Sequence, residues 1–261
     1  MSKPLCSVIM PVFNAAATLA ASIQSVRQQT FSDWELIVVD DCSSDSTPEI
    51  VKDFAVMDPR IRYVRMDANS GGPAAPRNRG IKEAVGRYMA FLDGDDLWYC
   101  DKLKSQLIAM RDSGWPISCT GFDVLGSDGI VIGAYMPPIA TDYAHALREN
   151  TLGCLSVVYD SEVLGKRYFP KLGHEDYALW LEILREGHLA HGLQQTLCAY
   201  RLTPGSVSRN KLRVLRFFFR IYRDREGFSA IQSLWLTIRY ALYNAGKYRR
   251  IGGAGPARDV Q

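Results

Sequence analysis

The chain has 261 residues, of which 47% are hydrophobic and 23% are charged. This composition is typical of a soluble globular protein and excludes a disordered or collagen-like chain. The sequence contains no sustained heptads and no repeat at solenoid periods, which excludes coiled-coil and repeat architectures. Because the six cysteines stand far apart, with no C-x-x-C pair and no secretory signal before them, we expect a reduced, cytoplasmic protein.

The formal net charge of +3 conceals a division along the chain. Residues 1–208 carry 19 Lys and Arg against 25 Asp and Glu, whereas residues 209–261 carry 12 against 3. A basic tail of this kind indicates an anionic partner, either a nucleic acid or a membrane surface. The longest apolar stretch, Ile231 to Tyr243, is interrupted by polar residues, so we expect no segment that spans a membrane.

Two apolar runs near the start of the chain predict buried strands. Leu5 to Val12 and Trp34 to Val39 lack alternation of polar and apolar residues, which is typical of parallel strands covered on both faces. Between them, Ala15 to Gln29 places apolar residues at helical spacing, so a βαβ unit is predicted. The alternation continues with a helix at Ile50 to Phe54, a strand at Ile61 to Arg65, a helix at Arg77 to Ala84, a strand at Tyr88 to Leu92 and a helix at Leu103 to Met110. This pattern predicts an α/β fold with a doubly wound, mostly parallel sheet and flanking helices.

Acidic residues follow the predicted strands at their carboxyl ends, where ligands bind in open parallel sheets. Asp40-Asp41 ends the second strand, and Asp93-Gly94-Asp95-Asp96 ends the fourth. Carboxylates at one edge repel one another, and a Mg²⁺ or Mn²⁺ ion held by one or two of them would compensate. A structural alternative is that Asp96 caps a helix beginning near Leu97 while Asp93 closes a turn.

An ordered set of sequence blocks carries a family resemblance. The blocks are Val8 to Asn14, Glu35 to Asp45, Pro73 to Gly80, Asp93 to Asp96 and, farther on, Gly173 to Tyr177. They resemble the nucleotide-sugar domain of family 2 glycosyltransferases, closely over about the first hundred residues and again at an acidic E-D motif. The resemblance implies a GT-A fold, a nucleoside-diphosphate sugar donor, a divalent metal and inversion at the anomeric carbon.

The resemblance assigns the base of the donor to the first two strand ends. It implies that Pro11, Phe13 and Asn14 line a uracil pocket, with the Phe13 ring free to stack, and that Asp41 accepts a hydrogen bond from the uracil imide. Such a bond to a carboxylate is charge-assisted and therefore strong. The structural alternatives are core packing for Phe13 and, for Asp41, a turn into Ser43-Ser44.

The remaining donor contacts fall on two later blocks. Arg77 is expected to approach the base or the diphosphate, with a surface ion pair as the alternative. Asp95 is expected to bind the Mn²⁺ or Mg²⁺ ion, and Asp93 to contact the ribose or the donor sugar. Trp98 stacks on an acceptor sugar or packs in the core, and Gly205 to Ser208 forms either a lid near the diphosphate or a plain loop.

The E-D motif opens a predicted amphipathic helix, because Tyr177, Trp180, Leu181 and Leu184 form an apolar stripe. Asp176 then stands in the first turn, half-sheltered by aromatic groups, which suits a general base that removes a proton from a sugar hydroxyl. The alternative is a helix N-cap. Glu175 is expected to orient the acceptor or Asp176.

These assignments predict a hexosyl- or N-acetylhexosaminyltransferase that moves a sugar from a UDP-sugar to a glycan hydroxyl. Alternatives are a non-catalytic nucleotide-sugar-binding protein and a transferase acting on a soluble or protein acceptor. A nucleotidyltransferase is disfavoured, because the glycine-rich basic loop of those enzymes is missing between Met10 and Leu19. We divide the chain into a GT-A domain at 1–208, with a nucleotide-binding half at 1–112 and an acceptor-binding half at 113–208, and a basic tail at 209–261.

The tail predicts amphipathic helices at Val214 to Tyr222 and Ile231 to Tyr243, followed by basic residues. Such helices lie in membrane interfaces, which predicts a peripheral enzyme at the inner face of the cell membrane with a lipid-linked acceptor. The resemblance to bacterial surface-polysaccharide enzymes suggests the same acceptor class. Nucleic-acid binding is disfavoured because no recognition motif accompanies the charge. The structural alternative is packing on the catalytic domain or on a second subunit of a homo-oligomer.

Overall fold

The computed structural model describes residues 3–202 and 211–251. Within these residues one mixed sheet runs in the order β3-β2-β1-β4-β9-β6-β10-β5, with β7 paired to β6 and β8 to β10. The first four strands in sequence are parallel to one another, and β9 joins them to the second half in antiparallel orientation. The strands are β1 Cys6–Val12, β2 Trp34–Asp40, β3 Ile61–Arg65, β4 Tyr88–Phe91, β5 Leu97–Trp98, β6 Ile117–Leu125, β7 Val131–Tyr135, β8 Ala140–Thr141, β9 Val158–Asp160 and β10 Ala190–Arg201.

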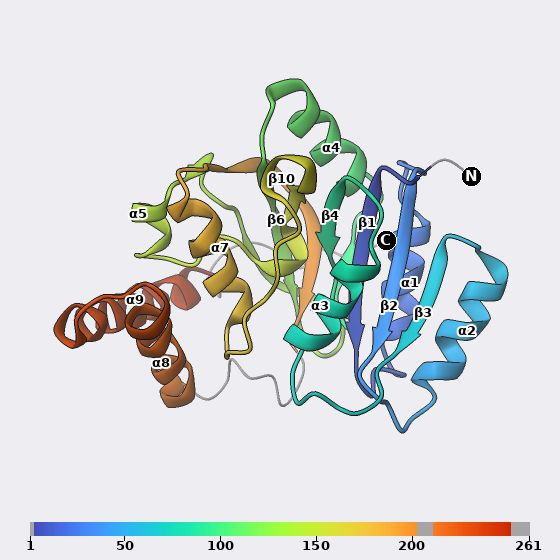
Figure 1. Ribbon diagram of the computed structural model, residues 1–261, viewed down its shortest axis with the longest axis horizontal. Coiled ribbons are helices and arrows are strands. Elements are labelled where there is room, and N and C mark those ends of the chain that lie inside the picture. Colours follow the sequence, from blue (N-terminus) through green and yellow to red (C-terminus); the bar gives the residue numbers. More distant parts are fainter. Residues whose placement is uncertain (1–2, 203–210, 252–261) are drawn as a thin grey trace.

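The helices cover both faces of this sheet and confirm the predicted α/β architecture (Figure 1). Those long enough to pack are α1 Leu19–Arg27, α2 Thr47–Met57, α3 Ala74–Glu83, α4 Lys102–Ser113, α7 Glu175–Arg185, α8 Lys211–Arg220 and α9 Ala230–Ile251, with short helices α5 Tyr143–Ala146 and α6 Ser161–Leu164. One buried cluster joins the sheet to α3, α7 and α8, and a second joins it to α1, α2 and α4. The apolar stripes predicted for these helices therefore face two cores, one on each side of the sheet.

The first helix begins later than its apolar spacing predicted. It starts at Leu19 rather than Ala15, because the preceding backbone is held by side chains of the next loop. The Ala15 N–H donates to Thr47 Oγ1 and the Ala16 N–H to Asp45 Oδ2. These bonds give the backbone N–H groups partners outside a helix.

The helix predicted to start near Leu97 does not exist, so the capping alternative for Asp96 is wrong. Leu97–Trp98 forms β5 and pairs with β10, and α4 starts only at Lys102. The Trp98 side chain is buried, and its indole N–H donates to the Leu155 carbonyl at 2.8 Å. Trp98 therefore belongs to the core, not to a sugar-stacking surface.

The two predicted tail helices are present and lie beside α7 at the end of the molecule away from β3 (Figure 1). A π-helical turn at Ile221–Arg225 follows α8. The side chains of Phe218, Ile221 and Tyr222 are fully buried in the core cluster that contains α7. The helices therefore pack on the α/β fold, while the division of the chain at residue 208 stays a prediction. No helix in the described part of the chain is long and apolar enough to cross a bilayer.

Candidate active site

The carboxyl ends of β1, β2 and β4 meet at one edge of the sheet and line a cavity of about 660 Å³. This volume lies within the range of small-ligand sites. A loop between β3 and α3 contributes the remaining wall. The lining residues are Pro11, Val12, Phe13, Asn14, Ala15, Ala17, Thr18, Asp41, Asn69, Gly71, Gly72, Pro73, Pro76, Asp93, Gly94 and Asp95.

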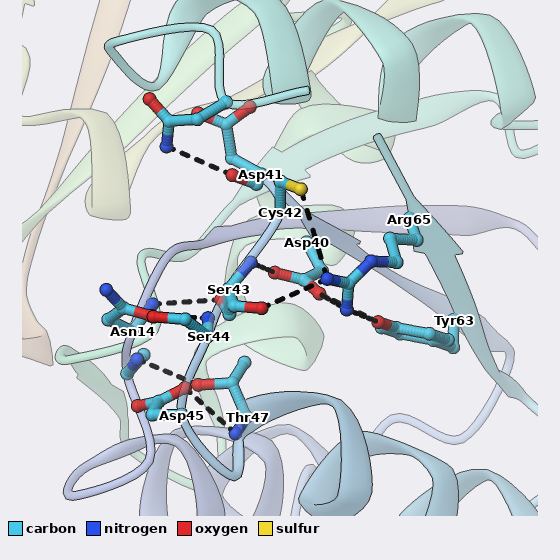
Figure 2. Close-up of polar contacts among 12 residues, drawn as sticks. Asn14, Asp40, Asp41, Cys42, Ser43, Ser44, Asp45, Thr47, Tyr63 and Arg65 are labelled. Carbon is cyan, nitrogen blue, oxygen red and sulfur yellow. Dashed lines mark hydrogen bonds and ion pairs between the residues drawn. The ribbon is translucent and has the colours of Figure 1, made fainter. Parts of the chain in front are cut away.

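The consecutive acids that end β2 have different environments, and their side chains point to different sides (Figure 2). The Asp40 carboxylate is fully buried and accepts from the Ser43 N–H, the Tyr63 hydroxyl and the Arg65 guanidinium. The Asp41 carboxylate lines the cavity and accepts from the N–H and the hydroxyl of Ser70. The turn predicted as the alternative for Asp41 is therefore made by Asp40, which leaves Asp41 at the ligand side.

The loop after β1 is joined to the loop after β2 by short hydrogen bonds (Figure 2). The Asn14 N–H donates to Ser43 Oγ, and the Asn14 side-chain oxygen accepts from the Ser44 N–H, both at 2.9 Å. Asn14 has a positive φ of 48°, a conformation that asparagine tolerates better than most residues. The neighbouring Phe13 is 51% exposed and lines the cavity, which rules out core packing.

The D-G-D-D turn after β4 depends on its glycine. A Cβ on Gly94 would lie 2.9 Å from Val12 Cγ1, and the Gly94 carbonyl accepts from the Thr18 hydroxyl at 2.8 Å. Only glycine allows so close an approach to β1. The turn places Asp93 and Asp95 in the cavity lining. Asp96 is instead buried and accepts from the Arg201 N–H, and its burial raises the pKa of that carboxyl well above its usual range.

Arg77 connects the D-G-D-D turn to the E-D motif. Its guanidinium donates to both carboxylate oxygens of Asp93, at 2.6 and 2.9 Å, and to Glu175 Oε1 at 2.8 Å. The side chain is 4% exposed and lies over the Phe169 ring. The surface ion-pair alternative is therefore wrong, and Arg77 is not among the residues that line the cavity.

The E-D motif opens α7 as predicted, but neither acid is its N-cap. His174 occupies that position with φ 55° and ψ 47°. Glu175 is buried, and burial raises the pKa of its carboxyl to about 6, with Arg77 opposing the rise and Asp176 adding to it. Asp176 stands in the first turn, partly exposed. No hydrogen bond joins its carboxylate to another described residue, so the capping alternative is excluded.

The donor set of the cavity fits a hard divalent cation. Among the described residues, no three His, Cys, Asp or Glu side chains converge as an all-protein metal centre would require. Mg²⁺ and Mn²⁺ need only one or two carboxylates when water and phosphate complete the shell. Arg77 donates to both oxygens of Asp93, and Asp95 lines the same cavity, so its assignment to such an ion stays a prediction.

The Arg201 side chain donates to the Asp95 carbonyl. Two further contributors to the site were not predicted from the sequence: Ser70, which donates to Asp41, and Asn69, which lines the cavity. Their only sequence signal is the Gly71-Gly72 turn, which indicates a loop but not its target. The proposed lid at Gly205 to Ser208 lies outside the described residues.

A cavity lined by carboxylates thus lies at the carboxyl ends of the strands, where enzymes with open α/β sheets bind their ligands. A family model, Glycosyl transferase family 2, matches residues 7–138. WfgD of Escherichia coli is 38% identical over 217 residues, covering 83% of this chain and 84% of the relative. TuaG of Bacillus subtilis is 37% identical over 249 residues, covering 95% and 98%. The chain therefore belongs to glycosyl transferase family 2 and is a glycosyltransferase.

The solved structures agree on the fold. TarS 1–349 of S. aureus, in complex with UDP-GlcNAc, superposes with a TM-score of 0.68 at 20% identity, over 90% of this chain and 70% of that one. At this identity the likeness concerns the backbone alone. It confirms the GT-A architecture that the family resemblance implied.

Proposed function

We propose that the protein is an inverting, UDP-sugar-dependent glycosyltransferase that extends a lipid-diphosphate-linked glycan during surface-polysaccharide synthesis. The observation that carries this proposal is the composition of the cavity of about 660 Å³. It combines an exposed aromatic ring at Phe13, a buried carboxylate at Asp41 and a carboxylate pair at Asp93 and Asp95. A nucleotide sugar needs a stacking face, an acceptor for its base N–H and compensation for its diphosphate.

In this proposal the uracil stacks on Phe13 within the walls supplied by Pro11 and Asn14. Asp41 is pre-positioned to accept the imide hydrogen bond, because Ser70 already fixes its carboxylate. Phe13→Ala should weaken UDP binding, and Phe13→Tyr should preserve it, because only the ring face is used. Equal UDP affinity in both variants would contradict the stacking role.

The reaction we propose is a single in-line displacement. Asp176 takes the proton of the acceptor hydroxyl while that oxygen bonds to the anomeric carbon, and the bond to the diphosphate breaks with its electron pair leaving on the diphosphate. The sugar inverts, so an α-linked donor gives a β-linked product. A Mn²⁺ or Mg²⁺ ion held by Asp95 would supply charge neutralisation for the leaving diphosphate. Arg77 holds Asp93 and Glu175 in place around the reacting groups.

The donor and acceptor class rests on the relatives. WfgD is named as a UDP-Glc:α-D-GlcNAc-diphosphoundecaprenol β-1,3-glucosyltransferase, and the name of TuaG refers to teichuronic acid biosynthesis. We therefore propose UDP-Glc as the first donor to test, with GlcNAc-diphosphoundecaprenol as acceptor. UDP-Gal, UDP-GlcNAc and UDP-GalNAc should be tested beside it.

The decisive assay measures UDP release that depends on the acceptor, and determines the anomeric configuration of the product by NMR. We expect turnover with at least one UDP-sugar and a β-linked product. An α-linked product would refute the single displacement. Turnover with a water-soluble glycan, but not with the lipid-linked one, would refute the acceptor class.

We further propose that the tail holds the enzyme at an anionic membrane surface on the cytoplasmic side. One stripe of α9 presents large apolar side chains that are between 51% and 83% exposed, namely Ile231, Leu234, Trp235, Ile238 and Leu242. Helices α8 and α9 contain Lys and Arg but no Asp or Glu. An anionic lipid interface accommodates both features, whereas pairing with a second copy would bring like charges together.

Truncating the tail would not test this, because Phe218 and Tyr222 belong to the core. The double variant Trp235→Ser, Ile238→Ser changes only exposed positions. We expect wild type to sediment with vesicles containing phosphatidylglycerol and the variant to remain in solution. A control at two exposed apolar residues of α2, Val56→Ser with Met57→Ser, should bind like wild type. Loss of a dimer in gel filtration, with vesicle binding unchanged, would assign the stripe to a second copy instead.

A further inference from the structure

The backbone just before the E-D motif, at Gly173 and His174, is tightly packed. A Cβ on Gly173 would overlap the ring of Phe217 on α8. The next residue, His174, adopts the left-handed conformation at φ 55°, which is uncommon outside glycine. Non-glycine residues keep such a conformation only where the surrounding structure over-determines it. The ring contacts of His174 with the described residues come from the tail.

Those contacts are aromatic. The His174 ring lies 6.1 Å from the Phe217 ring and 5.1 Å from the Phe218 ring, measured between centroids. Its Nε2 is buried with no hydrogen-bond partner among the described residues, and burial lowers the pKa of His174. The imidazole of His174 therefore packs against aromatic side chains of α8 in an apolar environment.

Phe218 is itself held rigidly. It is fully buried and stacks on Tyr240 of α9 at 3.5 Å, with Tyr177 of α7 at 4.8 Å. The hydroxyls of Tyr177 and Tyr222 are hydrogen-bonded at 2.9 Å. The first turn of α7 is thus attached to the tail through ring stacking and a buried hydroxyl pair.

We propose that Phe217 and Phe218 are positioning residues for Asp176, the proposed general base. On this proposal the tail takes part in catalysis as well as in membrane binding. The inference rests on the proposed role of Asp176. The start of α7 is held from two sides, by Arg77 through Glu175 and by α8 through Gly173 and His174. Asp176 has no hydrogen bond of its own to a described residue, so its place depends on these supports.

The test changes the size of the side chain on each side of the contact between Gly173 and Phe217. Phe217→Ala removes the ring that supports His174, and Gly173→Ala pushes that ring away. We expect either variant to lower kcat on the order of 10- to 100-fold, as small displacements of reacting groups do. UDP binding, measured calorimetrically, should stay within about twofold, because the donor cavity lies on other loops. The double variant, Gly173→Ala with Phe217→Ala, should lose no more kcat than Phe217→Ala alone, because the added methyl no longer meets a ring.

Phe219→Ala is the matched control, since it is the same change on the same helix and no ring contact joins Phe219 to the E-D segment among the described residues. It should keep the wild-type kcat. Activity is measured with UDP-Glc and GlcNAc-diphosphoundecaprenol in detergent, which removes any contribution of membrane binding.

The outcomes separate this proposal from the proposed function. Normal kcat in Phe217→Ala and Gly173→Ala, alongside an inactive Asp176→Asn, would overturn the positioning role alone. Full activity of Asp176→Asn would overturn the assignment of the base. A fall in kcat with parallel loss of UDP binding and melting temperature would show a structural role and overturn the proposal.

Discussion

The donor cavity and the acid pair at the start of α7 are held in place by different kinds of contact. In the cavity, neighbouring loops bind one another directly, as Asn14 does to Ser43 and Asp41 to Ser70. The acid pair relies on partners from distant parts of the chain. Arg77 lies 98 residues before Glu175, and α8 reaches it from the tail.

Because of this difference, the donor cavity and the acid pair should respond differently to substitution. Parallel strands bring their carboxyl ends to one edge whatever the side chains are, so the cavity depends on the sheet. The acid pair depends on a few buried contacts, and the loss of one partner leaves a charge or a void. Substitutions in the cavity should therefore alter ligand affinity locally, whereas substitutions around α7 should alter rate and stability.

The largest effect is expected at the proposed base. Asp176→Asn preserves shape but cannot accept a proton, so kcat should fall on the order of 10²- to 10⁴-fold. UDP affinity should be unchanged if the cavity and the acid pair are independent. Glu182→Gln, on the same helix, is the control and should remain active. A kcat within a few-fold of wild type in Asp176→Asn would mean that the base lies elsewhere.

Arg77 joins the two regions, because it pairs with both Asp93 and Glu175. Arg77→Met leaves the Asp93 and Glu175 carboxylates without their cation, and breaking a buried ion pair typically costs about 3–5 kcal/mol. Denaturant unfolding should show this loss. Arg79→Met removes an exposed pair with Glu83 on the same helix and should cost less than about 1 kcal/mol. Similar losses in the two variants would contradict the bridging role.

At the cavity, Asp95→Ala should remove the carboxylate proposed to hold the metal. We expect transfer to fall on the order of 10²-fold and added Mn²⁺ or Mg²⁺ not to restore it. In wild type, EDTA should abolish transfer and weaken UDP binding, and either ion should restore both. Full activity of Asp95→Ala in metal-free buffer would refute the site. Asp101→Ala, an exposed acid at the start of α4, serves as the control.

Glu175 of the acid pair should also make the stability of the protein depend on pH. Burial raises the pKa of Glu175 from 4.5 to about 6, so the folded state binds this proton more tightly than the unfolded state does. Stability is then lost as pH rises from about 4.5 to about 6, by about 2 kcal/mol at 1.36 kcal/mol per unit. Glu175→Gln should lack this loss, which denaturant unfolding across the pH range measures.

Glu186, at the other end of α7, has a pKa shift opposite to that of Glu175 and should therefore show the opposite pH dependence. Hydrogen bonding to Arg167 lowers the pKa of Glu186, so its contribution is present above its usual pKa and is lost as pH falls. Because Glu186 is exposed, Glu186→Gln should change the free energy of unfolding only slightly. The same pH dependence in Glu175→Gln and wild type would refute the raised pKa.

Among the substitutions that change ligand binding or rate, the smallest effect is expected at Phe13. Stacking of a base on an aromatic ring contributes about 1–3 kcal/mol, so Phe13→Ala should weaken UDP binding about tenfold while leaving stability unchanged. Calorimetry with UDP measures the first and thermal unfolding the second. Val56→Ala, another exposed apolar position, should affect neither. A loss of stability in Phe13→Ala would show that the cavity is less local than we infer.

Much of the cavity was predictable from the sequence. The apolar runs of β1, β2 and β4 set the strands, and Asn14, Asp41 and the D-G-D-D turn follow them directly. Because strand ends of a parallel sheet share an edge, short-range patterns were enough to bring these residues together. The amphipathic stripe of α7 likewise placed Asp176 in a first helical turn.

Only the tertiary structure decided which side chains support these groups. Nothing near Arg77 in the sequence distinguishes a surface residue from one that is buried between Asp93 and Glu175. The same holds for Phe217 and Phe218, whose apolar spacing predicts a helix but not that it packs on Gly173 and His174. Periodicity determines which face of an element is buried, whereas the partner of that face depends on contacts between residues far apart in sequence, and a local pattern carries no information about them.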